Sequence, residues 1–506
     1  MKRIFCCTLV MSFFLMTLIA QPKSISYSAS WESLKSHQIP EWFRDAKFGI
    51  YFHWGIYSYM GMGEWYSHYM YNEGHAVHKH HKEVYGEDFQ YHQFIPYFTA
   101  SEFVAEDWAK LFKASGARFA GPVAVHSDNF SNWNSEVNPY NSMKMGPRRD
   151  IVGELSKAIK KEGLKFITSF HHSWEWGWYP TWSGRVDTTA VGFEKFYGER
   201  TLPETFDYFR QGVRESGYFT GDILPRYAPS ESFVSLWKQK IYEVIDNYQP
   251  DFLWFDSRLF LIPEKDRQAM IAYYYNKESE WKKKVGMSYK NKDLPEGIAI
   301  LDLERGRMNE KVEFPWLTDD SWAWNAWSWK HKMRLKNSDI VIDELVDIVS
   351  KNGCLLLNIT PTCDGRIPEE MRSGLLEIGQ WLKVNGEAVY NTRPFITYGE
   401  GITKLKKNVF GGVQGDGVDY TAQDFRFTTN GDKLYITQLG MPAAGEKLLL
   451  HTFSKNGKVP DIKIKSLKLI GSKENIRWSQ TSEGLVIYAP KVLPNTKALV
   501  YKAVYE

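Results

Sequence analysis

Carboxylate and imidazole side chains follow several short apolar runs in this sequence, at positions where they could do chemistry. Asp256 and Glu304 each follow such a run, and so do His53 and His126. A retaining glycosidase needs two carboxyl groups roughly 5 Å apart, one to attack the sugar and one to donate a proton. The pattern therefore offers Asp256 as the nucleophile and Glu304 as the acid/base.

Both carboxylates also have a purely structural interpretation. Asp256 could simply cap the turn after its strand, as Asp often does. Glu304 could pair with Arg305 or Arg307 at the surface. Further acidic residues downstream are alternative proton donors: Glu310, Glu313, Asp319 and Asp320.

The elements that must position these residues alternate between strand and helix. Strand-like runs lie at 47–55, 119–125, 164–170, 250–256, 286–289, 298–303 and 354–359. Amphipathic helical segments are expected at 103–112, 150–161, 234–248 and 343–351. Repeated β/α units form barrels whose active sites lie at the carboxyl ends of the strands. Because fewer than eight helices are clear, we expect an irregular (β/α)8 TIM-like barrel over residues 21–393.

The two ends of the chain have different patterns. Residues 394–506 show short alternating runs separated by turn signals such as Asn430-Gly431, which predicts a C-terminal all-β sandwich. Residues 1–20 carry Lys2 and Arg3 before an apolar run, which predicts a signal peptide and export to a bacterial periplasm or the cell exterior. No later segment is apolar enough to span a membrane.

Composition narrows the class of ligand. The formal net charge of the 506 residues is only +3, which gives no indication of a nucleic-acid partner. Aromatic residues make up 16% of the chain and many stand beside polar residues, which favours a surface that stacks on sugars. A large aromatic core is the alternative interpretation. After removal of the signal only Cys354 and Cys363 remain, too few for a disulfide framework or a cysteine-rich metal site.

Two clusters of rings invite functional interpretations. The first is a lysine-rich segment that we expect to be a loop over the barrel mouth without a metal; its histidines are His75, His78, His80 and His81. The second is a run of tryptophans, some of which we expect to line the aglycone side of a pocket: Trp316, Trp322, Trp324, Trp327 and Trp329. Packing of the barrel on the sandwich is the alternative for Trp327 and Trp329.

Several motifs together resemble a known family. They are KFGIYFHWGIYS, GEWYSHYM, VHSDNFSNWNS, MGPRRDIVGEL, PDFLWFD and the long stretch that begins KNGCLLLNITPTCDGRIPEE. The chain is similar over nearly its whole mature length to glycoside hydrolase family 29, the α-L-fucosidases. The resemblance implies a retaining exo-hydrolase with an irregular barrel, a C-terminal sandwich, and neither cofactor nor metal.

The resemblance also implies roles for individual residues. Asp256 matches the family's nucleophile, and Trp254 matches the tryptophan of the same motif, a sugar contact. His53, Glu64 and Trp65 match residues that hold fucose hydroxyls or pack on its ring. We add His126, Ser127 and Trp316 to the expected substrate-binding residues.

The sequence departs from the family pattern at two places. Ser127 replaces one of two adjacent sugar-binding histidines, and a serine hydroxyl has a shorter reach and cannot become cationic. Leu317 stands where many relatives carry a carboxylate, which leaves the assignment of Glu304 open.

The leading hypothesis is an exported α-L-fucosidase that acts on a fucosylated oligosaccharide or glycoconjugate by double displacement. Ser127 motivates one alternative, a hydrolase for a related sugar such as an α-L-galactoside. A catalytically idle glycan-binding protein is the alternative from another class, and the retained Asp256, His53 and Trp254 argue against it.

Overall fold

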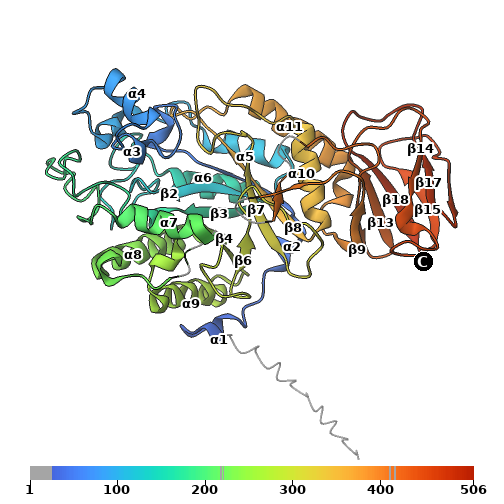
Figure 1. Ribbon diagram of the computed structural model, residues 1–506, viewed down its shortest axis with the longest axis horizontal. Helices are drawn as coiled ribbons and strands as arrows, with labels where there is room; N and C mark the ends of the chain where they lie inside the picture. Colours follow the sequence, from blue (N-terminus) through green and yellow to red (C-terminus); the bar gives the residue numbers. More distant parts are fainter. Residues whose placement is uncertain (1–25, 217–218, 220, 409–411, 415–417) are drawn as a thin grey trace, which may run out of the picture.

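The chain forms a parallel barrel followed by antiparallel sheets (Figure 1). The computed structural model describes residues 26–216, 219, 221–408, 412–414 and 418–506. The predicted signal peptide, residues 1–20, lies outside the described residues. Within the described part of the chain, no helix is both long and apolar enough to cross a bilayer.

Eight parallel strands close the barrel in sequence order, which confirms the predicted fold class. The strands are β1 (Phe48–Phe52), β2 (Phe119–Val125), β3 (Lys165–Phe170), β4 (Phe252–Phe255), β5 (Gly286–Lys290), β6 (Ile300–Asp302), β7 (Trp316–Ser321) and β8 (Gly353–Ile359). Nearly every residue in them is buried, because helices cover the outer face and side chains fill the interior.

The helices cover the barrel unevenly, as the sequence predicted. The α-helices are α1 (Trp31–Leu34), α2 (Glu41–Ala46), α3 (Tyr66–Tyr69), α4 (Ala76–Val84), α5 (Ala105–Ala114), α6 (Ile151–Lys161), α7 (Thr205–Ser216), α8 (Glu231–Tyr248), α9 (Glu264–Trp281), α10 (Ser338–Ser350) and α11 (Glu369–Asn385). Residues 291–299 and 303–315 join β5 to β6 and β6 to β7 without an α-helix. The outer ring of the barrel is therefore incomplete on that side.

Aromatic rings close the amino-terminal end of the barrel. The ring of Phe43, from α2, stacks on that of Phe252 with centroids 5.2 Å apart. Gly49 makes room for Phe119, because a Cβ atom at Gly49 would lie 2.2 Å from the Phe119 ring. The barrel is thus a packed core at this end, and a ligand can enter only from the carboxyl ends of the strands.

Strand β7 corrects the sequence interpretation of its segment. Trp316 is among the tryptophans of which we expect some to line a pocket, yet it begins a strand whose six residues are all buried and which pairs with β8. Thr318, Asp319 and Asp320 hid the strand, because three consecutive polar residues give no apolar run. Each of the two carboxylates pairs with a lysine inside the protein, Asp319 with Lys290 and Asp320 with Lys336.

The C-terminal residues form two packed antiparallel sheets, as predicted, and a separate two-stranded sheet of β10 (Lys406–Lys407) and β11 (Val413–Gln414). One sheet has the strand order β15-β18-β13-β12-β9, with β9 (Arg393–Glu400), β12 (Phe425–Asn430), β13 (Lys433–Gln438), β15 (Ile464–Leu469) and β18 (Leu499–Tyr505). The other has the order β14-β17-β16, with β14 (Lys447–Leu450), β16 (Trp478–Thr481) and β17 (Gly484–Tyr488). Apolar side chains from both sheets share one core, which includes Phe427, Ile436, Leu450, Ile487 and Tyr501.

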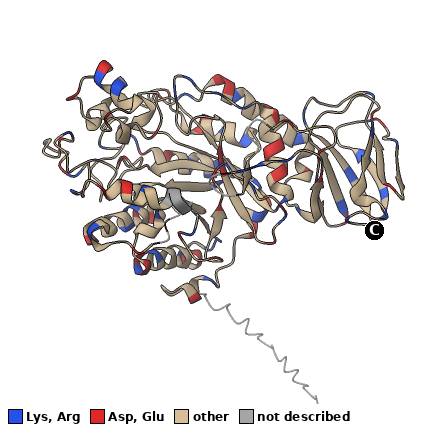
Figure 2. Cartoon of the chain, viewed as in Figure 1, with Lys and Arg blue, Asp and Glu red and all other residues tan. Residues whose placement is uncertain are grey.

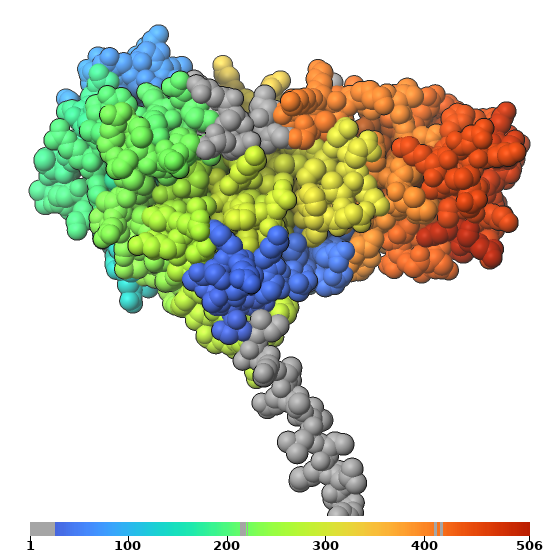
Figure 3. Space-filling view, turned by 60° about the horizontal axis from the view of Figure 1, so that its bottom comes forward, coloured from blue at the N-terminus to red at the C-terminus, as the bar shows by residue number. Residues whose placement is uncertain are grey.

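The two parts of the molecule are joined by a buried ionic network. Figure 3 shows the sandwich packed directly against the barrel. Asp347 on α10 accepts a hydrogen bond from Arg426 of β12 at 2.5 Å and pairs with Lys351 at 2.9 Å and Arg307 at 3.6 Å. Each of these side chains is at most 6% exposed. Burial of this kind is stable only when every charge is paired, so the network fixes how the two parts meet.

Candidate active site

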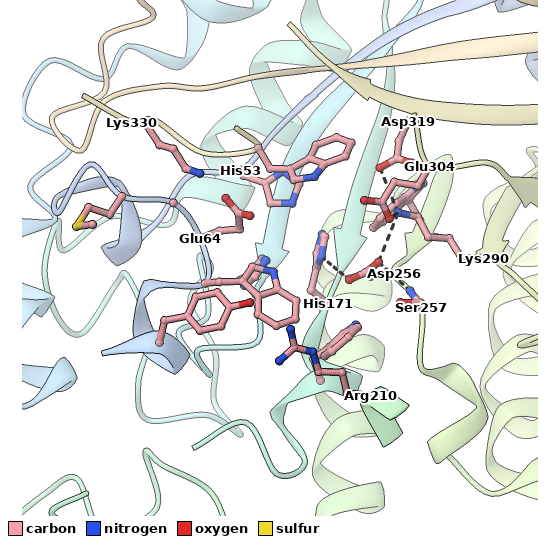
Figure 4. Close-up of a pocket in the computed structure, with 18 of the residues that line it drawn as sticks. His53, Glu64, His171, Arg210, Asp256, Ser257, Lys290, Glu304, Asp319 and Lys330 are labelled. Atoms are coloured by element: carbon pink, nitrogen blue, oxygen red, sulfur yellow. Dashed lines mark hydrogen bonds and ion pairs between the residues drawn. The ribbon is translucent and has the colours of Figure 1, made fainter. Parts of the chain in front are cut away.

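A pocket of about 690 Å³ opens at the carboxyl ends of the barrel strands (Figure 4). Strands β1, β2, β3, β4, β5 and β6 each contribute a residue at or just after their ends, and β7 contributes Asp319 from within the strand. The pocket is lined by His53, Met62, Gly63, Glu64, Trp65, Tyr69, His75, Val77, His126, His171, Trp174, Arg210, Trp254, Asp256, Ser257, Lys290, Asn291, Asp302, Glu304, Asp319, Trp327 and Lys330. Carboxylates, imidazoles and indoles on one surface suit a polyhydroxylated ligand.

Lys290 draws the two predicted catalytic carboxylates together. Its Nζ lies 3.5 Å from Oδ1 of Asp256 and 2.8 Å from Oε2 of Glu304. The two oxygens can be no farther apart than the sum of these distances, which is below the roughly 6.5 Å where the spacing of inverting enzymes begins. The side chains of Asp256 and Glu304 remain 20% and 23% exposed, so both carboxylates face the cavity.

The surroundings drive the pKa values of these two carboxylates in opposite directions. Burial favours the neutral form of Asp256, but Lys290 and a hydrogen bond from His171 outweigh it and hold the pKa below the usual range for Asp. Burial raises the pKa of Glu304, and the nearby charges of Asp319 and Asp256 raise it further against the opposing effect of Lys290. One group is thus held as a carboxylate and the other is biased toward its acid, as double displacement requires.

A polar layer beneath the pocket holds Lys290 in place. Oδ2 of Asp319 accepts a hydrogen bond from the Tyr51 hydroxyl at 2.8 Å and lies 3.3 Å from Lys290 Nζ. Asp302 accepts a hydrogen bond from the indole of Trp254 at 3.0 Å. Burial lowers the pKa of Lys290, but Asp319, Glu304 and Asp256 more than reverse this and raise it well above the usual value. The lysine therefore stays cationic between three carboxylates.

Three buried histidines line the pocket beside Asp256. They are His53, His126 and His171. One ring nitrogen of each lies within 4.8 Å of a ring nitrogen of the other two. Nδ1 of His126 and Nε2 of His171 have no hydrogen-bond partner although they are buried. Burial lowers the pKa values of His53 and His126 well below 6.5, so both rings are neutral at pH 7 and can exchange hydrogen bonds with hydroxyl groups.

The same three histidines are the group within the described residues that could hold a metal ion. Nδ1 of His171 meets Asp256 and Nδ1 of His53 meets Asn358, so outer partners of the kind that orient metal-binding histidines are present. The expectation that the protein works without a metal therefore stays a prediction that needs its own test.

The predicted histidine-rich loop is a helix, α4. We expected a loop because the segment has few apolar residues, and that expectation is wrong. The ring of His75 caps the helix by accepting a hydrogen bond from Val77 N. His78 and His81 bond to local groups, the carbonyl of Met70 and the hydroxyl of Tyr66 respectively. These local bonds leave the histidines facing separate partners rather than one shared centre.

Glu64 and Trp65 reach the pocket from a glycine-rich turn. Gly61 and Gly63 have φ angles of 63° and 106°, which glycine adopts without strain. Oε2 of Glu64 accepts hydrogen bonds from the backbone and hydroxyl of Ser328 at 3.2 and 3.1 Å. The turn therefore presents one oriented carboxylate and one indole to the ligand.

The structure does not bring two predicted binding residues to the pocket. Trp316 lies at the start of β7, the end remote from the pocket; it is fully buried and donates a hydrogen bond to the Lys351 carbonyl. Ser127 is buried with its hydroxyl directed at the His171 carbonyl, 3.5 Å away. Of the tryptophan run, Trp327 lines the pocket. Its ring stacks on the guanidinium of Arg305, with Cζ 4.5 Å from the ring centroid.

The alternatives to Glu304 are separated by their positions. Glu310 is exposed and Glu313 pairs with Lys311 in solvent, and neither lines the pocket. Asp320 points away from the pocket toward Lys336, while Asp319 is only 2% exposed and is occupied by Lys290 and Tyr51. Among the candidates, Glu304 is the carboxylate that the geometry favours as the acid.

Sequence reasoning missed Lys290 and Arg210 and left His171 without a role. Lys290 ends β5 just as Asp256 follows β4, but the predicted strand stopped one residue short of it. The signal was present, since a charged residue directly after an apolar strand points to the same rim of the barrel. Arg210 comes from α7, far from any strand end, and only the folded chain shows that it lines the pocket.

Comparisons with known proteins agree with this geometry. The sequence matches the family model described as alpha-L-fucosidase over residues 14–387. Tissue alpha-L-fucosidase of Rattus norvegicus is 28% identical over 483 residues, which cover 93% of this chain and 90% of that protein. Tissue alpha-L-fucosidase of Homo sapiens is 27% identical over 503 residues, which cover 94% and 90%.

A solved structure is similar over the same extent. The crystal structure of Thermotoga maritima alpha-fucosidase in complex with fucose superimposes with a TM-score of 0.72 at 27% sequence identity. The alignment covers 94% of this chain and 100% of that one. The likeness thus includes the barrel and the C-terminal sheets together.

Proposed function

Because the chain belongs to the alpha-L-fucosidase family, we propose that it hydrolyses terminal α-L-fucosyl residues of glycans with retention of configuration. The observation that carries this proposal is the shared contact of Asp256 and Glu304 with Lys290 inside one pocket. Two carboxyl groups with opposed pKa shifts are the parts that double displacement needs.

The first step forms a covalent intermediate. A carboxylate oxygen of Asp256 attacks the anomeric carbon as the glycosidic bond breaks, and the Glu304 acid gives its proton to the departing oxygen. Lys290 lies 3.5 Å from Oδ1 of Asp256, so it keeps the nucleophile ionised before the attack.

The second step releases the sugar. The Glu304 carboxylate, now deprotonated, takes a proton from water as the water oxygen attacks the anomeric carbon and frees Asp256. Two inversions give net retention, and Glu304 regains its proton for the next turnover. His53, His126, His171 and Glu64 are placed to hold the sugar hydroxyls, with Trp65 against its apolar face.

We also propose that the protein is exported, because residues 1–20 have the layout of a signal peptide. Its partner is then a fucosylated oligosaccharide or glycoconjugate outside the cytoplasm. The site does not favour the α-L-galactoside alternative, since the hydroxyl of Ser127, which motivated it, is directed at a backbone carbonyl.

Azide rescue with product analysis tests the proposal. The wild-type protein should hydrolyse an aryl α-L-fucoside, and Asp256→Ala should lose at least about a thousandfold in kcat/KM. Glu304→Ala should be rescued by azide and should yield an α-fucosyl azide, identified by NMR, because azide needs no general base and inverts the β-linked fucosyl-enzyme. A folded wild-type protein that hydrolyses no α-L-fucoside would refute the proposal, and a β-fucosyl azide from Glu304→Ala would refute the residue roles.

A further inference from the structure

Arg210 lines the pocket without a partner for its charge. It lies on α7 and is half-buried, and among the described residues it has no hydrogen bond or ion pair. Figure 4 shows its guanidinium at the edge of the pocket, directed inward. The carboxylates of Asp256, Glu304 and Asp319 on the pocket floor contact Lys290, and none of them forms an ion pair with Arg210.

A second guanidinium makes this side of the pocket more positive. Arg258 is fully buried and stacks on Trp174, with Cζ 3.7 Å from the ring centroid. None of its three guanidinium nitrogens has a hydrogen-bond partner. Trp174 and Arg210 both line the pocket, and Arg258 lies against the Trp174 ring. Asp256 and Asp293 act on the charge of Arg258, whereas Arg210 at the pocket edge is the guanidinium that can attract an anion from the ligand.

The neutral fucosyl group does not need such a charge. Its hydroxyls are served by the histidines and by Glu64, and the reacting carboxylates are held by Lys290. A guanidinium at the edge is instead suited to the part of the substrate that remains outside the sugar-binding floor. The planar fork of Arg matches the paired oxygens of a carboxylate or a sulfate group.

We propose that Arg210 makes the pocket selective for fucosides whose aglycone carries a carboxylate or a sulfate ester beside the scissile bond. This inference rests on the proposed function and adds the chemical class of the aglycone to it. Arg210 acts by binding the anionic substituent, and it takes no part in proton transfer or nucleophilic attack.

Lys330 supplies an internal comparison. It also lines the pocket, but Figure 4 draws it at the opposite edge, and its Nζ already donates a hydrogen bond to the Asn325 carbonyl at 3.1 Å. Its stem lies over Gly63, where a Cβ atom would be 2.6 Å from Lys330 Cε. Removal of this lysine changes the pocket charge as much as removal of Arg210, but at the edge of the pocket opposite to the proposed anion site.

The test compares three aryl α-L-fucosides that differ only in a meta substituent: a carboxamide, a carboxylate and a sulfate ester. The values of kcat/KM are measured at low salt and again at high salt for the wild type, Arg210→Gln, Arg210→Lys and Lys330→Gln. Lys332→Gln changes an exposed lysine of the same loop that does not line the pocket and serves as the matched control. Circular dichroism confirms that each variant is folded.

We expect the wild type to prefer at least one anionic fucoside over the carboxamide by roughly three- to tenfold at low salt. Arg210→Gln should abolish that preference, Arg210→Lys should keep part of it, and Lys330→Gln should keep most of it. The carboxylate and sulfate arms identify which anion fits, and high salt should weaken the preference.

Three results would overturn the inference. The wild type could show no preference for an anion, Arg210→Gln could keep the preference, or Arg210→Gln and Lys330→Gln could lose it equally, which would mean long-range attraction rather than a site. Turnover of the neutral fucoside without anion preference would overturn the inference alone. Absence of turnover with every fucoside would overturn the proposed function together with it.

Discussion

Lys290 is the residue that turns two carboxylates into a nucleophile and an acid. Its ammonium group lowers the pKa of both Asp256 and Glu304, while burial and the neighbouring acids raise the pKa of Glu304. The reaction needs Asp256 ionised and Glu304 protonated. The value of kcat/KM should therefore rise with pH as Asp256 ionises and fall as Glu304 loses its proton.

We predict that Lys290→Met moves both limbs of this pH profile to higher pH by about one to three units, because each carboxylate loses a cation within 4 Å. The measurement is kcat/KM for an aryl α-L-fucoside across the pH range. Lys330→Met, which removes a pocket cation that pairs with neither carboxylate, should leave both limbs in place. Unshifted limbs in Lys290→Met would show that the lysine does not set these pKa values.

The three pocket histidines lead to a separate prediction about metals. The proposed chemistry uses carboxylates and Lys290 only, so prolonged dialysis against EDTA should leave kcat/KM unchanged. Metal content is measured in the same sample by atomic spectrometry. A loss of activity that Zn²⁺ or another divalent ion restores would instead assign His53, His126 and His171 to a required metal centre.

At the scale of the elements, strands with continuous apolar residues were predictable and polar ones were not. The segment Phe252–Phe255 reads as a buried strand because every residue in it is apolar; the same holds for β2, and β8 is apolar apart from Asn358. Strand β7 escaped because its polar residues face partners supplied by distant segments, Lys290 and Lys336. Such partners are known only once the chain has folded.

The candidate site divides in the same way. Asp256, Glu304, His53 and His126 could be predicted because each follows an apolar run at the rim of the barrel. Trp316 was misplaced because its segment was not recognised as a strand. As the first residue of β7, Trp316 lies at the end of the strand opposite to the pocket. Arg210 could not be predicted, since helix α7 shows no feature in its sequence that points to the pocket.

Close packing at the amino-terminal end of the barrel gives a prediction for Gly49. Gly49→Ala should lower the free energy of unfolding by about 1–3 kcal/mol, because its Cβ would meet the Phe119 ring. Urea unfolding followed by fluorescence measures this change. Phe119→Leu in the same chain should recover part of the loss.

Gly184→Ala is the matched control for this change. A Cβ at Gly184 meets nothing within 4 Å, so the free energy of unfolding should change by less than about 0.5 kcal/mol. Equal effects of the alanine at Gly49 and at Gly184 would contradict the packing argument.

At the scale of the whole molecule, the surface of the described residues shows no excess of one charge that would bind a polyanion, and the charges that are concentrated lie between the barrel and the sandwich. Figure 2 shows basic and acidic residues interspersed over both parts, in keeping with the formal net charge of +3. The concentrated charge is internal, where Asp347 of α10 meets Arg426 of the sandwich.

We predict that Asp347→Asn destabilises the protein by about 3–5 kcal/mol, because buried cations would lose their shared carboxylate. Urea unfolding should be followed with two probes, since a two-part molecule need not unfold in one step. Asp339→Asn, on the same helix but with a 53% exposed carboxylate paired to Lys497, should cost at most about 1 kcal/mol. Similar losses in the two variants would argue that the buried network does not join barrel and sandwich.

The covalent step is the most direct test of the whole account. A 2-deoxy-2-fluoro-L-fucosyl fluoride carries a good leaving group, the fluoride at C1. Its fluorine at C2 slows hydrolysis of the glycosyl-enzyme, so the intermediate accumulates. Peptide mass spectrometry of the treated wild-type protein then locates the sugar. We predict one fucosyl adduct per chain, on Asp256; an adduct on Glu304 or any other residue, or none in protein that hydrolyses α-L-fucosides, would contradict double displacement through Asp256.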